Sequence, residues 1–191
     1  MSLLLPIGFL GFVNSKLNSR LFLSQPTGVS CGVTCLGIAL RFYYKKSFSF
    51  VDLARVCNLD RNGTSIRQLI AGAHTLGCHA VAQRKGWYGL FKSQLPVIAF
   101  VNYGHFVVVA RAASQRLLII DPAKGCYWIN RAQFESMSTG IILDLDFPES
   151  LMLKSSQWHR RLGFRRFWWP AERSFLLRSQ SYEVIQTPDP W

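Results

Sequence analysis

A cysteine at residue 31 stands at the end of a run of small and polar residues, SQPTGVSCG, directly before an apolar segment. The N-terminus of a helix favours a thiolate, because its amide dipoles and unpaired N–H groups stabilise negative charge. Cys31 is therefore a candidate nucleophile, and Gly32 beside it leaves room for a substrate carbonyl. A small buried side chain without chemistry also fits this position, so the interpretation requires partners elsewhere in the chain.

A thiol nucleophile needs a general base, and the chain has four histidines. His74 lies in a predicted helix, His79 in a predicted strand and His159 near the C-terminus, whereas His105 opens a strongly apolar strand after the turn NYG. Asp121 ends the following strand. Two strands joined by a short turn are antiparallel, so the start of one lies beside the end of the other. We therefore expect Asp121 to orient His105, as the third group of a catalytic triad does.

A donor for the developing oxyanion is the last requirement of acyl-transfer chemistry. Gln25 stands six residues before Cys31, and its amide together with the Cys31 backbone N–H supplies two such donors. Asn102 is a competing donor, although its place in the NYG sequence suits a turn.

The remaining cysteines suggest packing rather than chemistry. Cys35 follows Cys31 at helical spacing, but a zinc site there needs two further ligands, and no paired spacing of histidine or cysteine supplies them. We predict neither a metal nor a cofactor. Apolar sequence surrounds the other three cysteines and indicates core positions for them: Cys57, Cys78 and Cys126.

Elements that could position these residues follow from periodicity and capping patterns. Helices are predicted over 31–44, from Ser49 to about Cys57, and from Thr64 or Ser65 to Gly77. Residues 86–91 suggest a loop or a single turn. Strands are predicted at 79–84, 97–101, 105–110, 115–120, 126–130 and 140–145, with a short helix at 131–137. Helices followed by a meander of antiparallel strands indicate an α+β domain, with N-terminal helices packed on an antiparallel sheet.

An ordered set of motifs resembles the peptidase C39 family of bacteriocin-processing cysteine peptidases. The set comprises Gln25, CGVTCL at 31–36, GTS at 63–65, LPVIAF at 95–100, GHFVVV at 104–109, DPAKG at 121–125 and TGIILDL at 139–145. The resemblance implies a papain-like fold and cleavage of leader peptides after a Gly-Gly pair. It also implies Cys31 as nucleophile, His105 as general acid and base, Asp121 as its orienting group and Gln25 as oxyanion donor. Cys35 matches the family's second, non-catalytic cysteine.

Two departures from the family pattern keep alternatives open. The family usually has an acidic residue directly before the nucleophile, where this chain has Ser30. The family domain is usually the N-terminal part of an ABC exporter, yet no phosphate-binding G-x-x-x-x-G-K-[ST] motif or membrane-spanning stretch is found in this sequence. The chain is then a stand-alone peptidase, a remnant of a truncated exporter, or a leader-docking module without catalysis. An ABC exporter at the inner membrane is the expected partner.

Composition limits the remaining possibilities. The 191 residues, 49% of them hydrophobic, suffice for one domain and exclude a disordered chain. Five cysteines and no recognisable signal peptide predict reduced thiols in the cytoplasm, with a peripheral position on the membrane as an alternative. The net charge of +12 is scattered, and nothing matches a common nucleic-acid-binding motif. We divide the chain into a lead-in at 1–21, the peptidase-like domain at 22–147 and a basic, aromatic tail at 148–191.

Overall fold

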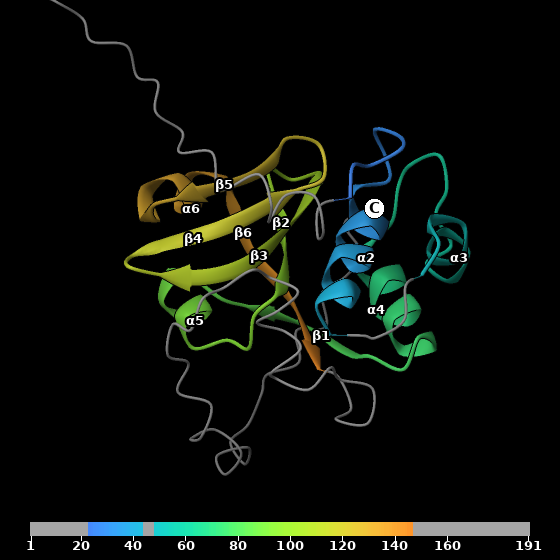
Figure 1. Cartoon of the computed structure of the whole chain (residues 1–191), viewed down its shortest axis with the longest axis horizontal. Coiled ribbons are helices and arrows are strands. Elements are labelled where there is room, and N and C mark those ends of the chain that lie inside the picture. The colour runs from blue at the N-terminus through green and yellow to red at the C-terminus, as the bar shows by residue number, and fades with distance from the viewer. Residues whose placement is uncertain (1–22, 44–47, 147–191) are drawn as a thin grey trace, which may run out of the picture.

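The computed structural model describes residues 23–43 and 48–146, shown in colour in Figure 1. The predicted lead-in 1–21, the tail 148–191 and His159 lie outside the described residues. The division of the chain into three parts therefore stays a prediction.

Three helices come first along the described chain, as predicted. They are α2 at Cys31–Tyr43, α3 at Phe50–Val56 and α4 at Ile66–Thr75. The Ser49 side chain accepts a hydrogen bond from the Asp52 backbone N–H and starts α3. Ser65 and Gln68 form a reciprocal capping box that starts α4. These local polar signals explain why the sequence predicted the start of α3 at Ser49 and limited the start of α4 to Thr64 or Ser65.

Six strands form one antiparallel sheet in the order β1-β6-β2-β3-β4-β5. The prediction of a simple meander was wrong in one respect, because the last strand returns to lie between β1 and β2. The strands are β1 His79–Arg84, β2 Val97–Val101, β3 His105–Ala113, β4 Arg116–Asp121, β5 Gly125–Ile129 and β6 Ser138–Asp146.

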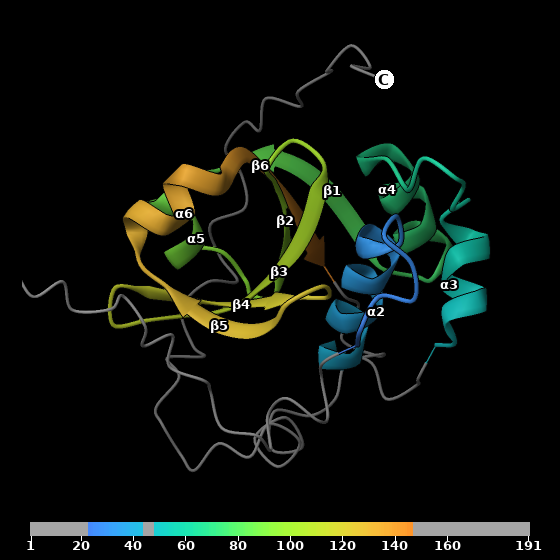
Figure 2. The ribbon, with the colours of Figure 1, turned by 90° about the horizontal axis from the view of Figure 1, so that it is seen from above.

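Both faces of the sheet are covered. Successive side chains along each strand point to opposite faces, so they pack in two separate cores. Ile98, Phe106 and Ile120 pack with helices α2, α3 and α4 on one face. On the other face, Val107 and Ile119 pack with the short helices α5 (Trp87–Phe91) and α6 (Arg131–Met137). Figure 2 shows α5 and α6 inside the curve of the sheet and helices α2, α3 and α4 on its outer side. This sandwiched sheet is the rigid element to which α2 is attached.

Candidate active site

Cys31 is the first residue of α2 and is only 6% exposed. The residue after it brings the helix close to the sheet. A Cβ atom at Gly32 would stand 3.1 Å from Cδ2 of Phe106 and 3.2 Å from Cδ1 of Leu69, closer than most such contacts. Glycine at this position therefore allows the N-terminus of α2 to approach the start of β3.

The second cysteine of α2, Cys35, stabilises the contact between this helix and the start of β3. The Cys35 thiol, fully buried, donates a hydrogen bond to the Phe106 carbonyl with a sulfur–oxygen distance of 3.2 Å. Burial raises the pKa of this thiol well above its ordinary value, so it remains protonated and able to donate. Because Phe106 follows His105 directly, this bond connects the helix that carries Cys31 to the strand that carries His105.

His105 and Asp121 meet where β3 begins and β4 ends, as the antiparallel pairing predicts. Nε2 of His105 lies 2.9 Å from Oδ1 of Asp121, and the Asp121 side chain is 1% exposed. The Ala123 backbone N–H donates to Oδ1 at 2.8 Å, and the Tyr127 hydroxyl donates to Oδ2 at 3.3 Å. The carboxylate is therefore supported by three donors and held in one orientation.

Electrostatics within this cluster favour an ion pair. The hydrogen bond to Asp121, followed by that to Cys31, raises the pKa of His105 to about 9. Burial by itself raises the pKa of Cys31, but the His105 hydrogen bond and charge, with the amides of Phe106 and Gly32, bring it below its ordinary value. Burial likewise opposes ionisation of Asp121, yet hydrogen bonds from His105 and Ala123 lower its pKa. These shifts favour a thiolate beside an imidazolium over a neutral thiol beside a neutral ring.

The ring of His105 has two nitrogens with separate tasks. Nε2 is engaged by Asp121, so Nδ1 is the nitrogen left for the hydrogen bond with the Cys31 sulfur. A carboxylate that fixes one nitrogen directs the other toward the nucleophile.

The segment before α2 forms a closed turn around one carbonyl group. Gln25 Nε2 donates to the Thr27 carbonyl at 3.0 Å, and the Ser30 hydroxyl donates to the same oxygen at 2.8 Å. The backbone N–H of Gln25 donates to the Pro122 carbonyl at 3.1 Å, which ties this segment to the residue after Asp121. Oε1 of Gln25 is buried without a hydrogen-bond partner. Its amide orientation is fixed, because only the NH₂ group donates to a carbonyl, and a second N–H remains for another acceptor.

Ser30 is fully buried, and its hydroxyl is engaged within this turn rather than by the helix. The first backbone N–H groups of α2 have no acceptor within the helix, and Ser30 does not cap them. These N–H groups, including that of Cys31, are the donors that an oxyanion would meet at this helix start.

Other residues singled out in the sequence lie away from this cluster. Asn102 belongs to the turn between β2 and β3, where its backbone N–H donates to the Met137 carbonyl at 2.8 Å. Nε2 of His74 lies 3.2 Å from the Ala80 carbonyl, and the His74 ring stacks on that of His79. Three further cysteines are buried, as predicted: Cys57, Cys78 and Cys126.

Tyr127, whose hydroxyl donates to Asp121, is a side chain of the site that the sequence did not suggest. Burial and the charge of Asp121 raise its pKa, so its hydroxyl stays protonated and donates to the carboxylate. The position of Tyr127 just after the DPAKG turn could have predicted this contact, because the turn places β5 antiparallel to β4, beside Asp121.

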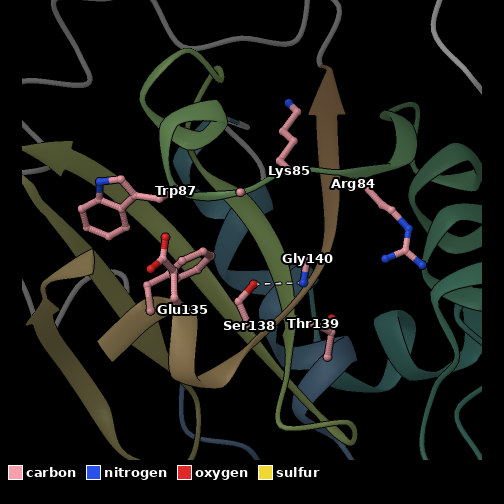
Figure 3. A pocket seen from close by; sticks show the side chains of 9 residues that line it. Arg84, Lys85, Trp87, Glu135, Ser138, Thr139 and Gly140 are labelled. Carbon is pink, nitrogen blue, oxygen red and sulfur yellow. Dashed lines mark hydrogen bonds between the residues drawn. The ribbon is translucent and has the colours of Figure 1, made fainter. Parts of the chain in front are cut away.

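A separate pocket lies between the β1–α5 segment, α6 and the start of β6 (Figure 3). Charged and aromatic side chains line it, among them Arg84, Trp87 and Glu135. None of Gln25, Cys31, His105 and Asp121 contributes to this pocket. It is therefore distinct from the cysteine–histidine cluster.

A cysteine at a helix N-terminus, facing a histidine–carboxylate pair on an antiparallel sheet, places the domain in the papain-like α+β class of cysteine peptidase folds. The match to known families is more specific. The chain belongs to the peptidase C39 family, whose model matches residues 21–149.

Two relatives illustrate the range of proteins that share this domain. The chain is 31% identical over 140 residues to an uncharacterized protein of Methanothermobacter marburgensis, covering 72% of this chain and 96% of that protein. It is 27% identical over 133 residues to the probable microcin-H47 secretion/processing ATP-binding protein MchF of Escherichia coli, covering 70% of this chain. That alignment spans only 19% of MchF.

Solved structures agree with the fold. A double glycine motif protease from an AMS/PCAT transporter, crystallised with the leader peptide, superposes with a TM-score of 0.62 at 27% identity, over 66% of this chain and 91% of that one. The peptidase domain of Streptococcus ComA gives the same TM-score at 20% identity, over 68% and 99%. In the part of the chain that the structure describes, no helix has the length and apolar character needed to cross a bilayer.

Proposed function

We propose that this chain is a cysteine endopeptidase that cleaves leader peptides of bacteriocin-like precursors after a Gly-Gly pair. The observation that supports the proposal most directly is the cluster of Cys31, His105 and Asp121, in which charge and hydrogen bonding favour a thiolate and an imidazolium. The similarity to a double glycine motif protease crystallised with a leader peptide supports the substrate class.

In this mechanism the Cys31 thiolate attacks the carbonyl carbon of the second glycine and forms a carbon–sulfur bond. The carbonyl oxygen becomes an oxyanion, for which the Cys31 backbone N–H and the remaining Gln25 amide N–H are the available donors. When the carbon–nitrogen bond breaks, the His105 imidazolium transfers its proton to the leaving amine. The neutral imidazole then takes a proton from a water molecule as its oxygen attacks the thioester. The carbon–sulfur bond breaks, the leader is released as a carboxylic acid, and the thiolate and the imidazolium are restored.

Asp121 has a positioning role in this scheme. Its carboxylate holds Nε2 of His105 and keeps the ring charged, which stabilises the thiolate in turn. The Ala123 N–H and the Tyr127 hydroxyl hold the carboxylate itself. The imidazolium is therefore present before substrate binds.

The wider setting of the proposed reaction follows from the relatives. MchF is by name a secretion/processing ATP-binding protein, so we extend the proposal to an ABC exporter as partner and to action on the cytoplasmic face of the membrane. A leader-docking module without turnover is the competing function, and it predicts binding of a leader peptide without cleavage.

Mass spectrometry of a synthetic Gly-Gly leader precursor, incubated with the protein under reducing conditions, tests the proposal. We expect cleavage after the second glycine by the wild type and none by the Cys31→Ala variant. Cys35→Ala is the matched control, because it removes the other thiol of α2 and should keep cleavage. Undiminished cleavage by Cys31→Ala would refute the assignment, and binding without cleavage by the wild type would favour the docking module.

A further inference from the structure

The turn between β2 and β3 leads directly into His105. Val101 pairs with His105 across the hairpin, and the Gly104 N–H donates to the Val101 carbonyl at 3.3 Å. Within this turn Asn102 and Tyr103 both have φ of 50°, in the left-handed region. Asparagine is common in such a conformation, but a bulky side chain there is an outlier and costs free energy.

A second turn in the same sheet has the same backbone and a different composition. Between β3 and β4, Ser114 and Gln115 have φ of 48° and 60°. That turn lies at the opposite end of β3 from His105 and uses polar residues for its left-handed positions. The backbone geometry alone therefore does not call for an aromatic residue at position 103.

Tyr103 is also the most exposed of the large hydrophobic residues in the described chain, at 81%. The other strongly exposed aromatic, Tyr88, accepts a hydrogen bond from Arg131, whose guanidinium lies 4.9 Å from the Tyr88 ring centroid. No comparable contact holds the Tyr103 side chain to another described residue. A strained backbone thus presents an aromatic ring to solvent where nothing in the fold uses it.

The position of Tyr103 relative to His105 indicates which part of a substrate it could meet. Two residues of chain separate Cα atoms by at most about 7 Å, so the Cα atom of Tyr103 lies within that distance of the Cα atom of His105. His105 must reach the leaving amine, which belongs to the residue directly after the scissile bond. Exposed side chains in the turn that leads into His105 are therefore the ones nearest to that end of a bound peptide.

We infer that Tyr103 is a specificity-determining residue that contacts the side chain of the substrate residue directly after the scissile bond and favours an apolar one. The inference rests on the proposed peptidase function and adds to it a preference on the product side of the cleavage point. The face of the phenol ring offers apolar contact area, and the exposure of Tyr103 leaves that face accessible to a bound peptide.

The test uses two Gly-Gly precursor peptides that differ only in leucine or serine after the second glycine. We expect kcat/KM of the wild type to favour leucine by roughly three- to tenfold, the size of a single aromatic–apolar contact. Tyr103→Gly, which suits a positive φ, should bring that ratio close to one without lowering Tm. Tyr103→Phe should keep the preference.

Gln115→Gly is the matched control, because it makes the same backbone change in the turn far from His105. The rate at which iodoacetamide alkylates Cys31 should be the same in wild type and Tyr103→Gly, which separates substrate contact from damage to the ion pair. A leucine preference that survives in Tyr103→Gly, or equal cleavage of both peptides by the wild type, would overturn this inference alone. Cleavage of neither peptide by the wild type would overturn the proposed function and this inference with it.

Discussion

Replacing Asp121 by asparagine tests whether the buried carboxylate keeps His105 charged. The asparagine carbonyl can still accept from Nε2 of His105 and from the Ala123 N–H, and its NH₂ group can donate to the Tyr127 hydroxyl. The shape of the site is therefore conserved while its negative charge is lost. The first cause of the raised pKa of His105 is this carboxylate, so the pKa should fall from about 9 toward the ordinary 6.5.

The consequence can be expressed as a fraction of charged rings. At pH 8 a histidine with a pKa of 9 is about nine-tenths protonated, whereas one with a pKa of 6.5 is only a few per cent protonated. We therefore expect Asp121→Asn to lose roughly tenfold or more of kcat/KM at pH 8 and much less at pH 6, where both rings are mostly charged. The pH dependence distinguishes this loss from a general structural defect.

Nuclear magnetic resonance of the histidine rings measures the cause without any substrate. The chain has four histidines, and the His105 signal is the one missing from His105→Gln. We expect it to titrate near pH 9 in the wild type and clearly lower in Asp121→Asn. If the His105 titration is the same in both proteins, or already lies near 6.5 in the wild type, the reasoning about the ion pair is refuted.

Three further predictions concern the contact between α2 and β3 and the ion pair itself. Gly32→Ala should push the helix from Phe106 and slow iodoacetamide alkylation of Cys31 at pH 6, with little change in Tm from circular dichroism. Cys35→Ala should cost about 1–3 kcal/mol of unfolding free energy in urea, because it leaves a small cavity and an unpaired carbonyl. In Cys31→Ala the hydrogen bond and charge of Asp121 still raise the pKa of His105, which stabilises the fold below pH 6.5, and urea titrations should show this contribution decreasing as pH rises above 6.5.

The parts of the structure that could be predicted from the sequence are those with local causes. Ser49 and Ser65 start their helices through side-chain bonds to residues three positions later. The sequence predicted the first of these starts and limited the second to Thr64 or Ser65. His105 and Asp121 meet because β3 and β4 form a hairpin, in which residues close together in the sequence are paired. The pairing of a strand start with a strand end was therefore predictable without knowledge of the rest of the fold.

The parts that could not be predicted depend on distant contacts. The position of β6 between β1 and β2 is decided by pairing between residues far apart in the chain. Helix α5 begins at Trp87, its N-cap Gly86 supplies no side-chain bond, and Trp87 and Leu90 hold the helix by packing into the core on that face of the sheet. The bond from Cys35 to the Phe106 carbonyl has no sequence signature, because any residue supplies a carbonyl.

Ser30 shows how the departure from the family pattern is accommodated. This position is fully buried and one residue from a sulfur that carries negative charge in the favoured state. A carboxylate there would oppose the thiolate by repulsion, whereas a serine adds no charge and satisfies its hydroxyl on Thr27. With the hydroxyl so engaged, the Ser30 side chain does not take up the first N–H groups of α2, one of which, that of Gly32, donates to the Cys31 sulfur. The thiolate of Cys31 therefore depends on His105, the amides of Gly32 and Phe106 and the start of α2, and none of these needs an acidic residue at position 30.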